Sequence, residues 1–398
     1  MKKYFYSSHK IDSSDIVKVS KTLEENALSR GPLINKFEIK LSKFTNSKYV
    51  VAVNNGTSAL IAAIKSLNLK KNSTIAVPNI TFVATASSVL LNGYKIVLLD
   101  VSKESGLIEL KTIQNAIDKY KIACLINVHL NGNIGDLKSI FKLCKKHKVK
   151  IIDDACHALG TKYFLNKKNY NICDNSFCDI STLSFHPSKL ITTGEGGAIL
   201  TNNYKIYKKL REICNHGYQR FQIKKKKYTH EYYKINNVGY NFRISDINCA
   251  LGLNQLNKIV AKINHRRMIA RIYDNIFKYN EFIEVLKIKK NVKSAYHLYP
   301  IFIKNFNKIN KLKLMKKLKE KKIFTQIHYF PLNRQPLFAK KNKFFPESQI
   351  YFEKVLSIPM HEKININDAK FIGKNIIKEI IKIKNIKLKY ANKRYFVN

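Results

Sequence analysis

Between residues 48 and 154, short runs of aliphatic and β-branched residues alternate with segments of helical periodicity, and this alternation constrains the fold most. Strands are predicted at residues 49–53, 74–77, 94–101, 123–128 and 150–154, and helices at residues 57–67, 82–91, 110–120 and 137–146. Strands that alternate with helices in this way are typical of an α/β domain whose mostly parallel sheet is covered on both faces. In such sheets, ligands bind beyond the carboxyl ends of the strands.

The pattern changes in the last third of the chain. A longer helix is predicted at about residues 246–262, and Lys-rich helical segments mixed with short strands follow it. A chain of 398 residues can form two domains around one active site. We therefore predict a large domain over residues 1–255 and a smaller α+β domain over residues 256–398.

The net charge of +46, from 73 Lys and Arg against 27 Asp and Glu, allows two interpretations. A nucleic-acid or anionic-membrane partner would need basic residues concentrated on one face or tail. The excess here is nearly all Lys, is spread along the whole chain and accompanies abundant Ile and Asn, which favours compositional drift in an A/T-rich genome. No nucleic-acid or membrane partner is therefore expected.

The seven cysteines are odd in number, are scattered along the chain and form no C-x-x-C pair. This pattern predicts free thiols in a reducing compartment and favours neither disulfides nor a structural metal site. The N-terminus shows no apolar targeting segment, and no apolar run approaches membrane-spanning length. A cytoplasmic protein without a bound metal is expected.

Two candidate ligand-binding groups lie where predicted strands end. Gly56, Thr57 and Ser58 follow a strand and open a helix, so free amides, the helix dipole and two hydroxyls could hold a phosphate; an ordinary helix cap is the alternative. Asp153 and Asp154 close another strand, where one acid can be solvated while the other points inward. Asp154 could keep the pyridine nitrogen of pyridoxal 5′-phosphate protonated, which makes the ring an electron sink; a helix cap or a solvated strand end is the alternative.

A third candidate, Lys189, ends the run SFHPSK, which begins at Ser184 and is followed by TTGEGG. A lysine that forms an imine with a cofactor aldehyde must lose its proton, which needs a desolvated site near other cationic groups. An isolated lysine is more often a solvated surface residue. With the helix start at Gly56 and the strand-end Asp154, Lys189 predicts a pyridoxal-phosphate site in an enzyme that acts on amines and carbonyls. Ser184 would face the cofactor phosphate, and His157 would either contact the phenolic oxygen of the ring or be structural.

Five segments together resemble the DegT-type sugar-nucleotide aminotransferases, which are fold type I pyridoxal-phosphate enzymes. They are residues 48–60 with the sequence GTSAL, DDACHALG at 153–160, SFHPSK at 184–189, TTGEGG at 192–197 and GYNFR at 239–243. Their order and spacing match the family from about residue 5 to about residue 360. Within the family, the branch for pseudaminic-acid biosynthesis is the most similar, because of Tyr6 and Ser7, FHPSKLITTGEGG, HLYP at 297–300, QIHY at 326–329 and LSIP at 356–359.

The resemblance implies a role for each matching residue. Lys189 binds the cofactor covalently and moves protons, Asp154 pairs with the pyridine nitrogen, and Phe82 stacks on the ring. The cofactor phosphate is held by Gly56, Thr57, Ser58 and Ser184, and by an Asn241 that comes from the second subunit of a homodimer. The sugar-nucleotide pocket is lined by Tyr6, Asn26, Ala27, Leu28, Ser29, Gln326, Ile327, His328 and Tyr329.

The implied reaction moves the amino group of L-glutamate to carbon 4 of a UDP-linked 4-keto-6-deoxy-N-acetylhexose. A transaminase for a GDP- or dTDP-linked keto sugar is one alternative. A sugar dehydratase of the same fold is a second, and it is disfavoured because dehydratases replace the lysine that this chain keeps as Lys189. A nucleic-acid-binding protein is an alternative from a different class, and no helix-turn-helix or zinc pattern supports it.

Overall fold

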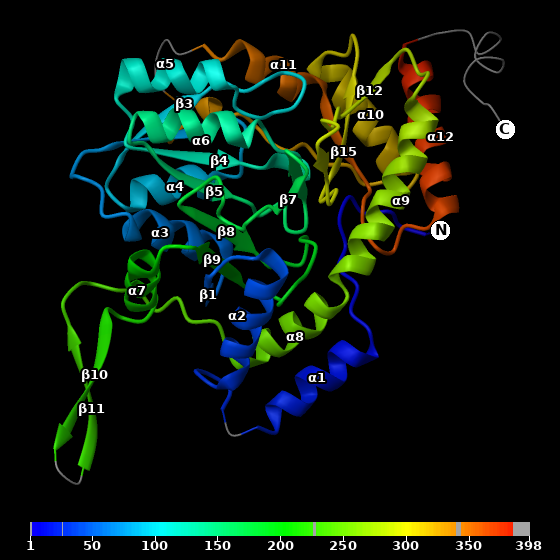
Figure 1. Cartoon of the computed structure of the whole chain (residues 1–398). Helices are drawn as coiled ribbons and strands as arrows, with labels where there is room; N and C mark the ends of the chain where they lie inside the picture. The colour runs from blue at the N-terminus through cyan, green and yellow to red at the C-terminus, as the bar shows by residue number, and fades with distance from the viewer. Residues whose placement is uncertain (1, 26, 226–227, 340–343, 385–398) are drawn as a thin grey trace.

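The computed structural model describes residues 2–25, 27–225, 228–339 and 344–384, and a seven-stranded sheet forms its centre (Figure 1). The strand order is β1-β9-β8-β5-β4-β2-β3. The strands are β1 Tyr49–Val53, β2 Thr74–Pro78, β3 Lys95–Leu99, β4 Cys124–Val128, β5 Lys150–Asp154, β8 Ile180–Ser184 and β9 Gly197–Thr201. Within this sheet β9 is antiparallel to both of its neighbours, and the other pairs are parallel. The prediction of a mostly parallel sheet is confirmed.

Helices cover both faces of the sheet because its strands carry apolar side chains on both sides. The helices α3 Gly56–Ser66, α4 Val83–Leu91 and α7 Tyr204–Ile213 pack on the face that includes Val51 and Ile152. The helices α2 Pro32–Thr45, α5 Leu110–Tyr120, α6 Leu137–Lys146 and α8 Asp246–Asn257 pack on the opposite face, which includes Val50 and Ile151. With both faces covered, ligands have access to the sheet at the carboxyl ends of the parallel strands.

A second apolar core lies around a three-stranded antiparallel sheet of β12 Ile283–Val285, β14 Tyr299–Ile303 and β15 Val355–Ile358. The helices α9 Ile259–Phe277, α10 Lys308–Glu320 and α12 Ile366–Ile383 contribute to this core, and α11 Pro346–Lys354 packs beside β14. Tyr4, near the N-terminus, is also buried in it. The division of the chain at residue 256 stays a prediction.

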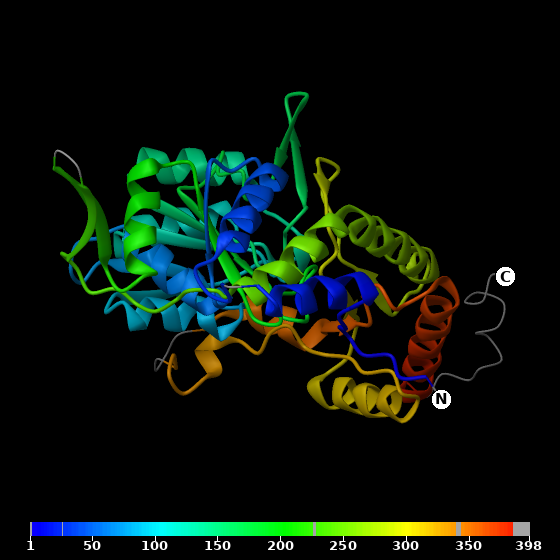
Figure 2. The same ribbon diagram turned by 90° about the horizontal axis from the view of Figure 1, so that it is seen from below.

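The long helix predicted over residues 246–262 is instead two helices, because α8 ends at Asn257 and α9 begins at Ile259. The N-terminal helix α1 Ser13–Leu23 packs against α8. A small sheet joins β6 Lys162–Leu165, β7 Lys168–Asn171 and β13 Val292–Lys293, and two short 3-10 helices lie at Leu130–Gly132 and Leu332–Arg334. The hairpin of β10 Tyr218–Lys225 and β11 Tyr228–Ile235 extends away from the rest of the chain in both views (Figures 1 and 2).

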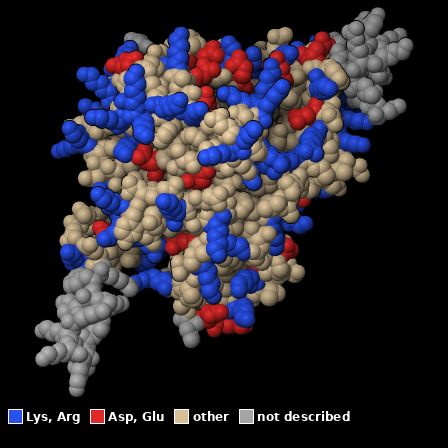
Figure 3. All heavy atoms as spheres, in the orientation of Figure 1, with Lys and Arg blue, Asp and Glu red and all other residues tan. Residues whose placement is uncertain are grey.

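The basic residues do not gather over one element of the face shown in Figure 3. Lys and Arg side chains are scattered across it, with acidic groups between them. On this face, the charge is not concentrated in the way that a nucleic-acid-binding patch requires. Among the described residues, no helix has both the length and the apolar character that crossing a membrane requires.

Candidate active site

The N-terminus of α3 lies against Ser184, at the carboxyl ends of β1 and β8. The amides of the first helical residues have no partner within the helix, and the side chain of Asn55 accepts a hydrogen bond from one of them, Ser58 N, at 2.8 Å. The amides of Gly56 and Thr57 therefore stay available for a ligand. A Cβ atom on Gly56 would lie 2.8 Å from Ser184 Cβ and 3.2 Å from Ser184 Oγ, so glycine is needed for this close approach. The Ser184 hydroxyl and two free amides thus meet at the positive end of a helix dipole.

Lys189 lies in the connection between β8 and β9, in a turn where its amide donates to the His186 carbonyl at 2.8 Å. Burial lowers the pKa of Lys189, while the neighbouring Cys156 and Asp154 partly oppose this shift. The Ser7 hydroxyl donates to the Ser188 carbonyl at 3.0 Å and joins the N-terminal arm to the same turn. Lys189 therefore holds a neutral amine more readily than an exposed lysine does.

Asp154 is buried at the carboxyl end of β5, 6% exposed. Its Oδ2 accepts a hydrogen bond from Thr85 Oγ1 at 2.9 Å, and its Oδ1 accepts one from the Cys156 amide at 3.2 Å. Asp153 points to the other face of the sheet, as alternation along a strand requires, and its Oδ2 lies 3.2 Å from His129 Nε2. The expectation that one of the two acids is solvated is wrong, since Asp153 is also buried, 4% exposed.

Aromatic and imidazole rings surround the space beside Lys189. Tyr329 Oη lies 3.2 Å from His157 Nε2, and the Phe82 ring lies 6.0 Å from the Tyr329 ring. Burial, with the charge of Lys189 and the neighbouring His328, lowers the pKa of His157, so this imidazole is neutral near pH 7. Phe82, which precedes α4, is 55% exposed. An aromatic side chain so exposed beside polar groups is suited to cover a planar ligand.

The segment 326–329 and the N-terminal arm form one wall of the site. The rings of Tyr6 and His328 lie 5.4 Å apart, and His328 Nδ1 lies 2.9 Å from Ser357 Oγ. Burial, with the charge of Lys189, lowers the pKa of His328 to about 3. Gln326 pairs with the backbone of Ser357, and its side-chain Oε1 accepts from the Ile327 amide at 2.9 Å. Ser357 therefore holds the backbone of Gln326, while the Gln326 residue itself is exposed to solvent.

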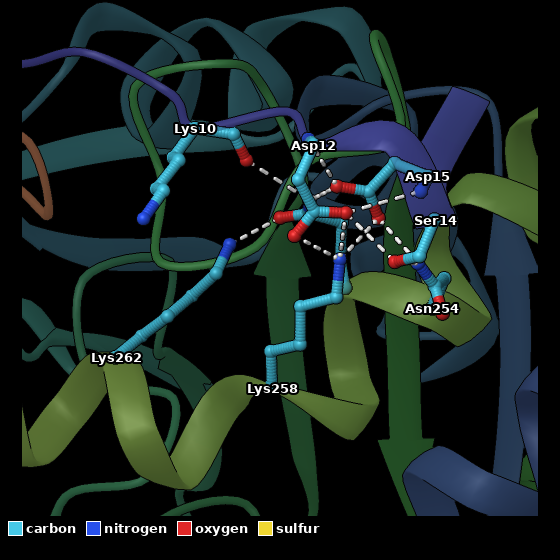
Figure 4. A network of polar contacts seen from close by, with 8 residues as sticks. Lys10, Asp12, Ser14, Asp15, Asn254, Lys258 and Lys262 are labelled. Atoms are coloured by element: carbon cyan, nitrogen blue, oxygen red, sulfur yellow. Dashed lines mark hydrogen bonds and ion pairs between the residues drawn. The ribbon is translucent and has the colours of Figure 1, made fainter.

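A polar network fixes the other end of the N-terminal arm (Figure 4). Asp15 of α1 is 1% exposed and accepts hydrogen bonds from Asn254 Nδ2 at 2.7 Å and Gln255 Nε2 at 2.8 Å. Lys258 Nζ, at the junction of α8 and α9, lies 2.7 Å from both carboxylate oxygens of Asp12 and 3.1 Å from Asp15 Oδ1. The arm that carries Tyr6 is therefore held at both α1 and the Lys189 turn.

Four other predicted site residues, Ala27, Leu28, Ser29 and Asn241, lie in two further segments. The Leu28 carbonyl accepts from the amide of Asp246 at 2.9 Å, and Ser29 pairs with Ser245, so Ala27 to Ser29 lie at the start of α8. Asn241 pairs with Asn215 and is exposed. No hydrogen bond joins these residues to Lys189 or Tyr329 within the ranges that the structure describes. Asn26 lies outside the described residues.

Three residues of the site were missed by sequence reasoning. Asn55 had a signal, because it directly precedes the helix start and stands three positions before Ser58, where an N-cap side chain accepts. The other two residues had no such signal in the sequence. Thr85 donates to Asp154, and the backbone N–H of Asn131 donates to His157 Nδ1 at 3.4 Å. Their contacts join segments separated by 69 and 26 residues.

Residues 9–377 match the sequence model of the DegT/DnrJ/EryC1/StrS aminotransferase family. A Campylobacter jejuni protein named UDP-4-amino-4,6-dideoxy-N-acetyl-beta-L-altrosamine transaminase is 33% identical over 95% of this chain and 98% of its own length. A Helicobacter pylori protein of the same name is 31% identical, with the same two coverages. The solved structure of Helicobacter pylori PseC, an aminotransferase involved in the biosynthesis of pseudoaminic acid, superposes with a TM-score of 0.86 at 29% identity. That alignment covers 96% of this chain and 100% of the other.

Proposed function

Because the chain belongs to the DegT/DnrJ/EryC1/StrS aminotransferase family, we propose that it moves the amino group of L-glutamate to carbon 4 of a UDP-linked 4-keto-6-deoxy-N-acetylhexose. The product is UDP-4-amino-4,6-dideoxy-N-acetyl-β-L-altrosamine, the sugar in the name of the Campylobacter and Helicobacter relatives. The pathway is pseudaminic-acid biosynthesis, in which the Helicobacter pylori aminotransferase of similar structure is involved. The cofactor is pyridoxal 5′-phosphate. The observation that carries the proposal is that Lys189, whose pKa burial lowers, lies near the buried carboxylate of Asp154 and five residues after Ser184, which contacts the start of α3 at Gly56.

The residues present fit this cofactor. The contact between Gly56 and Ser184 leaves a cradle that a Cβ atom would fill, and the free amides there suit a phosphate dianion. Asp154 suits the pyridine nitrogen, and the exposed ring of Phe82 suits the ring face. When bound, the cofactor supplies an electron sink for the carbanion that forms at the amino carbon.

Each side chain then has a distinct task. Lys189 would hold the cofactor through its aldehyde and, as a neutral amine, would move protons at the reacting carbons. Thr85 and the Cys156 amide hold the Asp154 carboxylate in one orientation. Tyr6, Gln326 and His328 bind the sugar nucleotide, and the arm network holds Tyr6 in place.

Product identification tests the reaction. The purified protein is incubated with L-glutamate and a panel of UDP-, GDP- and dTDP-linked 4-keto-6-deoxy sugars, and products are identified by mass spectrometry and NMR. We expect the UDP-linked amino sugar, no product from Lys189→Ala, and a borohydride-stabilised cofactor adduct at position 189 of the unmodified protein. Preferred conversion of a GDP- or dTDP-linked sugar would instead support the alternative substrate, and no amino sugar at all would refute the proposal.

We also infer that the active site is shared between two copies of the chain. Asn241 is exposed, yet the neighbouring Phe242 carbonyl accepts from the Asn54 amide at 2.9 Å, beside the helix start that would hold the phosphate. The hairpin β10–β11 precedes this loop and carries the exposed rings Tyr232 and Tyr233, 48% and 62% exposed. An extended hairpin with exposed aromatic side chains is suited to pack on a second subunit.

Subunit mixing tests the shared site. Lys189→Ala and Asn241→Asp proteins are each expected to be inactive as homodimers. Mixing under conditions that exchange subunits restores activity if Asn241 acts on the partner's cofactor, because each hybrid then has one complete site. Mixtures that stay inactive, although exchange is demonstrated by mass spectrometry of the intact dimer, would contradict the shared site.

A cytoplasmic location is part of the proposal. All seven cysteines are free thiols, and six of them are buried, which agrees with a reducing compartment. Cell fractionation with an antibody against the chain would test the location. Recovery with extracytoplasmic markers would contradict it.

A further inference from the structure

We propose that the Tyr329 hydroxyl is the hydrogen-bond donor to the ketone oxygen of the acceptor sugar, and that His157 fixes the direction of that donor. This inference rests on the proposed function and assigns to Tyr329 a task beyond lining the pocket. His157 lies near Lys189, whose charge acts on it, and Tyr329 lies near Asp154, whose charge acts on it. The two residues meet each other, with Tyr329 Oη 3.2 Å from His157 Nε2.

The hydrogen bonds of His157 determine which of its nitrogens carries the proton. The backbone N–H of Asn131 can only donate, so His157 Nδ1, which lies 3.4 Å from that nitrogen, is the acceptor. Burial keeps the imidazole neutral, so its single proton is on Nε2. Nε2 lies 3.2 Å from Tyr329 Oη and therefore donates to it. The phenolic proton of Tyr329 is then left to point away from His157.

Within the described part of the chain, Tyr329 Oη has no other hydrogen-bond partner. A hydroxyl donor in a desolvated site that lacks an acceptor costs free energy until a ligand supplies one. Tyr329 is partly exposed, so this donor can reach a bound molecule. Burial, with the nearby Asp154, raises the pKa of Tyr329, so the hydroxyl keeps its proton throughout the working pH range.

Packing holds the pair in place. The His297 ring lies 4.3 Å from the His157 ring, and a Cβ atom on Gly132 would approach the His157 carbonyl to 3.0 Å. The His328 ring meets the Tyr329 ring edge-on, with centroids 4.9 Å apart. Rings packed from several sides keep one rotamer, so the direction of the Tyr329 donor is set before substrate binds.

A ketone oxygen is the acceptor that fits this donor. When an amine nitrogen adds to the carbonyl carbon, the π electron pair of the C=O bond moves to the oxygen, and a preorganised donor stabilises the negative charge that develops there. The oxygen then leaves as water, carrying the two protons that the amine nitrogen gives up. The neutral amine of Lys189 is a much weaker hydrogen-bond donor than a phenol, and its lone pair suits it to act as a base. The site therefore combines a base at Lys189 with a hydrogen-bond donor at Tyr329, which retains its proton in this interaction.

Tyr329→Phe tests the donor, since it removes the hydroxyl and keeps the ring. We expect kcat for the keto sugar to fall about 100-fold, as for the loss of one preorganised donor, with KM nearly unchanged. The pH titration of the visible cofactor absorbance should not move. Tyr279→Phe, at a residue that is 77% exposed, is the matched control and should behave as the unmodified enzyme. An unchanged kcat in Tyr329→Phe, or a shifted absorbance titration that reports contact with the cofactor oxygen, would overturn the inference.

Substitutions of His157 test its positioning role. His157→Gln keeps an N–H that can donate to Tyr329 and should retain much more activity than His157→Leu. In a Tyr329→Phe background, His157→Leu should cause little further loss, because both residues act through one hydroxyl. If the fold-losses of kcat in the two single variants instead multiply in the double variant, His157 acts independently of the Tyr329 hydroxyl. If the unmodified enzyme forms no amino sugar, the proposed function fails, and that result is separate from any comparison between variants.

Discussion

Gly56→Ala is the sharpest test of the phosphate cradle. The added Cβ would lie 2.8 Å from Ser184 Cβ, so the helix start and Ser184 must separate by about 0.6 Å or more to reach ordinary contact. Relieving such overlap costs about 1–3 kcal/mol. The movement also misaligns the Gly56 and Thr57 amides and the Ser184 hydroxyl, and a hydrogen bond to a charged group contributes about 1.5–3 kcal/mol.

These magnitudes predict a specific loss of cofactor affinity. The dissociation constant for pyridoxal 5′-phosphate should rise about 10- to 100-fold, since each 1.4 kcal/mol is a factor of ten. Absorbance titration of the apoprotein measures this constant, and urea denaturation of the apoprotein measures stability separately. Gly135→Ala is the matched control, because its Cβ would meet only Ile140 Cδ1 at 3.5 Å and the Ile108 carbonyl at 3.9 Å.

The two variants separate the explanations. If Gly56→Ala binds the cofactor as tightly as Gly135→Ala, the start of α3 does not hold the phosphate, and the reasoning is refuted. If Gly56→Ala lowers the stability of the apoprotein by several kcal/mol and weakens binding no further than Gly135→Ala does, the close contact serves the fold alone.

Three further predictions concern Thr85, Lys189 and Lys258. Thr85→Val, which removes the donor to Asp154, should lower the free energy of unfolding by about 1.5–3 kcal/mol in urea denaturation, whereas Thr85→Ser should not; equal stability of the two variants would contradict the hydrogen bond. Because burial lowers the pKa of Lys189, the fraction of neutral amine rises with pH and reaches half at a pH below the usual lysine value of about 10.4. The rate of cofactor attachment to the apoprotein should therefore level off below that pH, and a midpoint at or above it would refute the shift. Lys258→Met leaves the buried Asp15 without its cation, so proteases should cut the N-terminal arm faster; since Lys258 is 28% exposed, the loss of stability should be only about 1 kcal/mol. An unchanged cutting rate would show that the ion pair does not hold α1.

Strong periodicity made much of the large sheet predictable from the sequence. The predicted strands 49–53 and 150–154 and the helices 110–120 and 137–146 have the bounds that the structure gives for β1, β5, α5 and α6. Buried parallel strands read as apolar runs, so their position follows from local sequence. The same alternation places Gly56 and Asp154 at the carboxyl edge. The family resemblance drawn from the motifs is confirmed by the match over residues 9–377.

Strands without an apolar run were not predicted. The sequence of β8, ISTLS, contains three hydroxyl side chains, yet Ser181 and Thr182 are fully buried because neighbouring strands cover them. The hairpin β10–β11 was missed because its sequence is rich in Lys and Tyr and shows no sustained alternation of apolar and polar residues. The prediction of a single helix over residues 246–262 is wrong for a different reason. Lys258 interrupts it where the ion pairs to Asp12 and Asp15 form, and those partners lie more than 240 residues earlier.

The structure also distinguishes Lys189 from other lysines of this basic chain without reference to any motif. Burial lowers the pKa of three lysines among the described residues, which are Lys189, Lys262 and Lys311. Lys262 donates to Gln255 and Lys311 donates to the Phe352 carbonyl, so each has a fixed acceptor that stabilises its cation. In the described ranges, the Lys189 amine has neither a hydrogen bond nor an ion pair. A desolvated amine without a fixed acceptor loses its proton most easily and is free to react with a carbonyl group. Compositional drift adds lysines at the surface, and it does not produce this combination of burial and a missing acceptor beside a carboxylate.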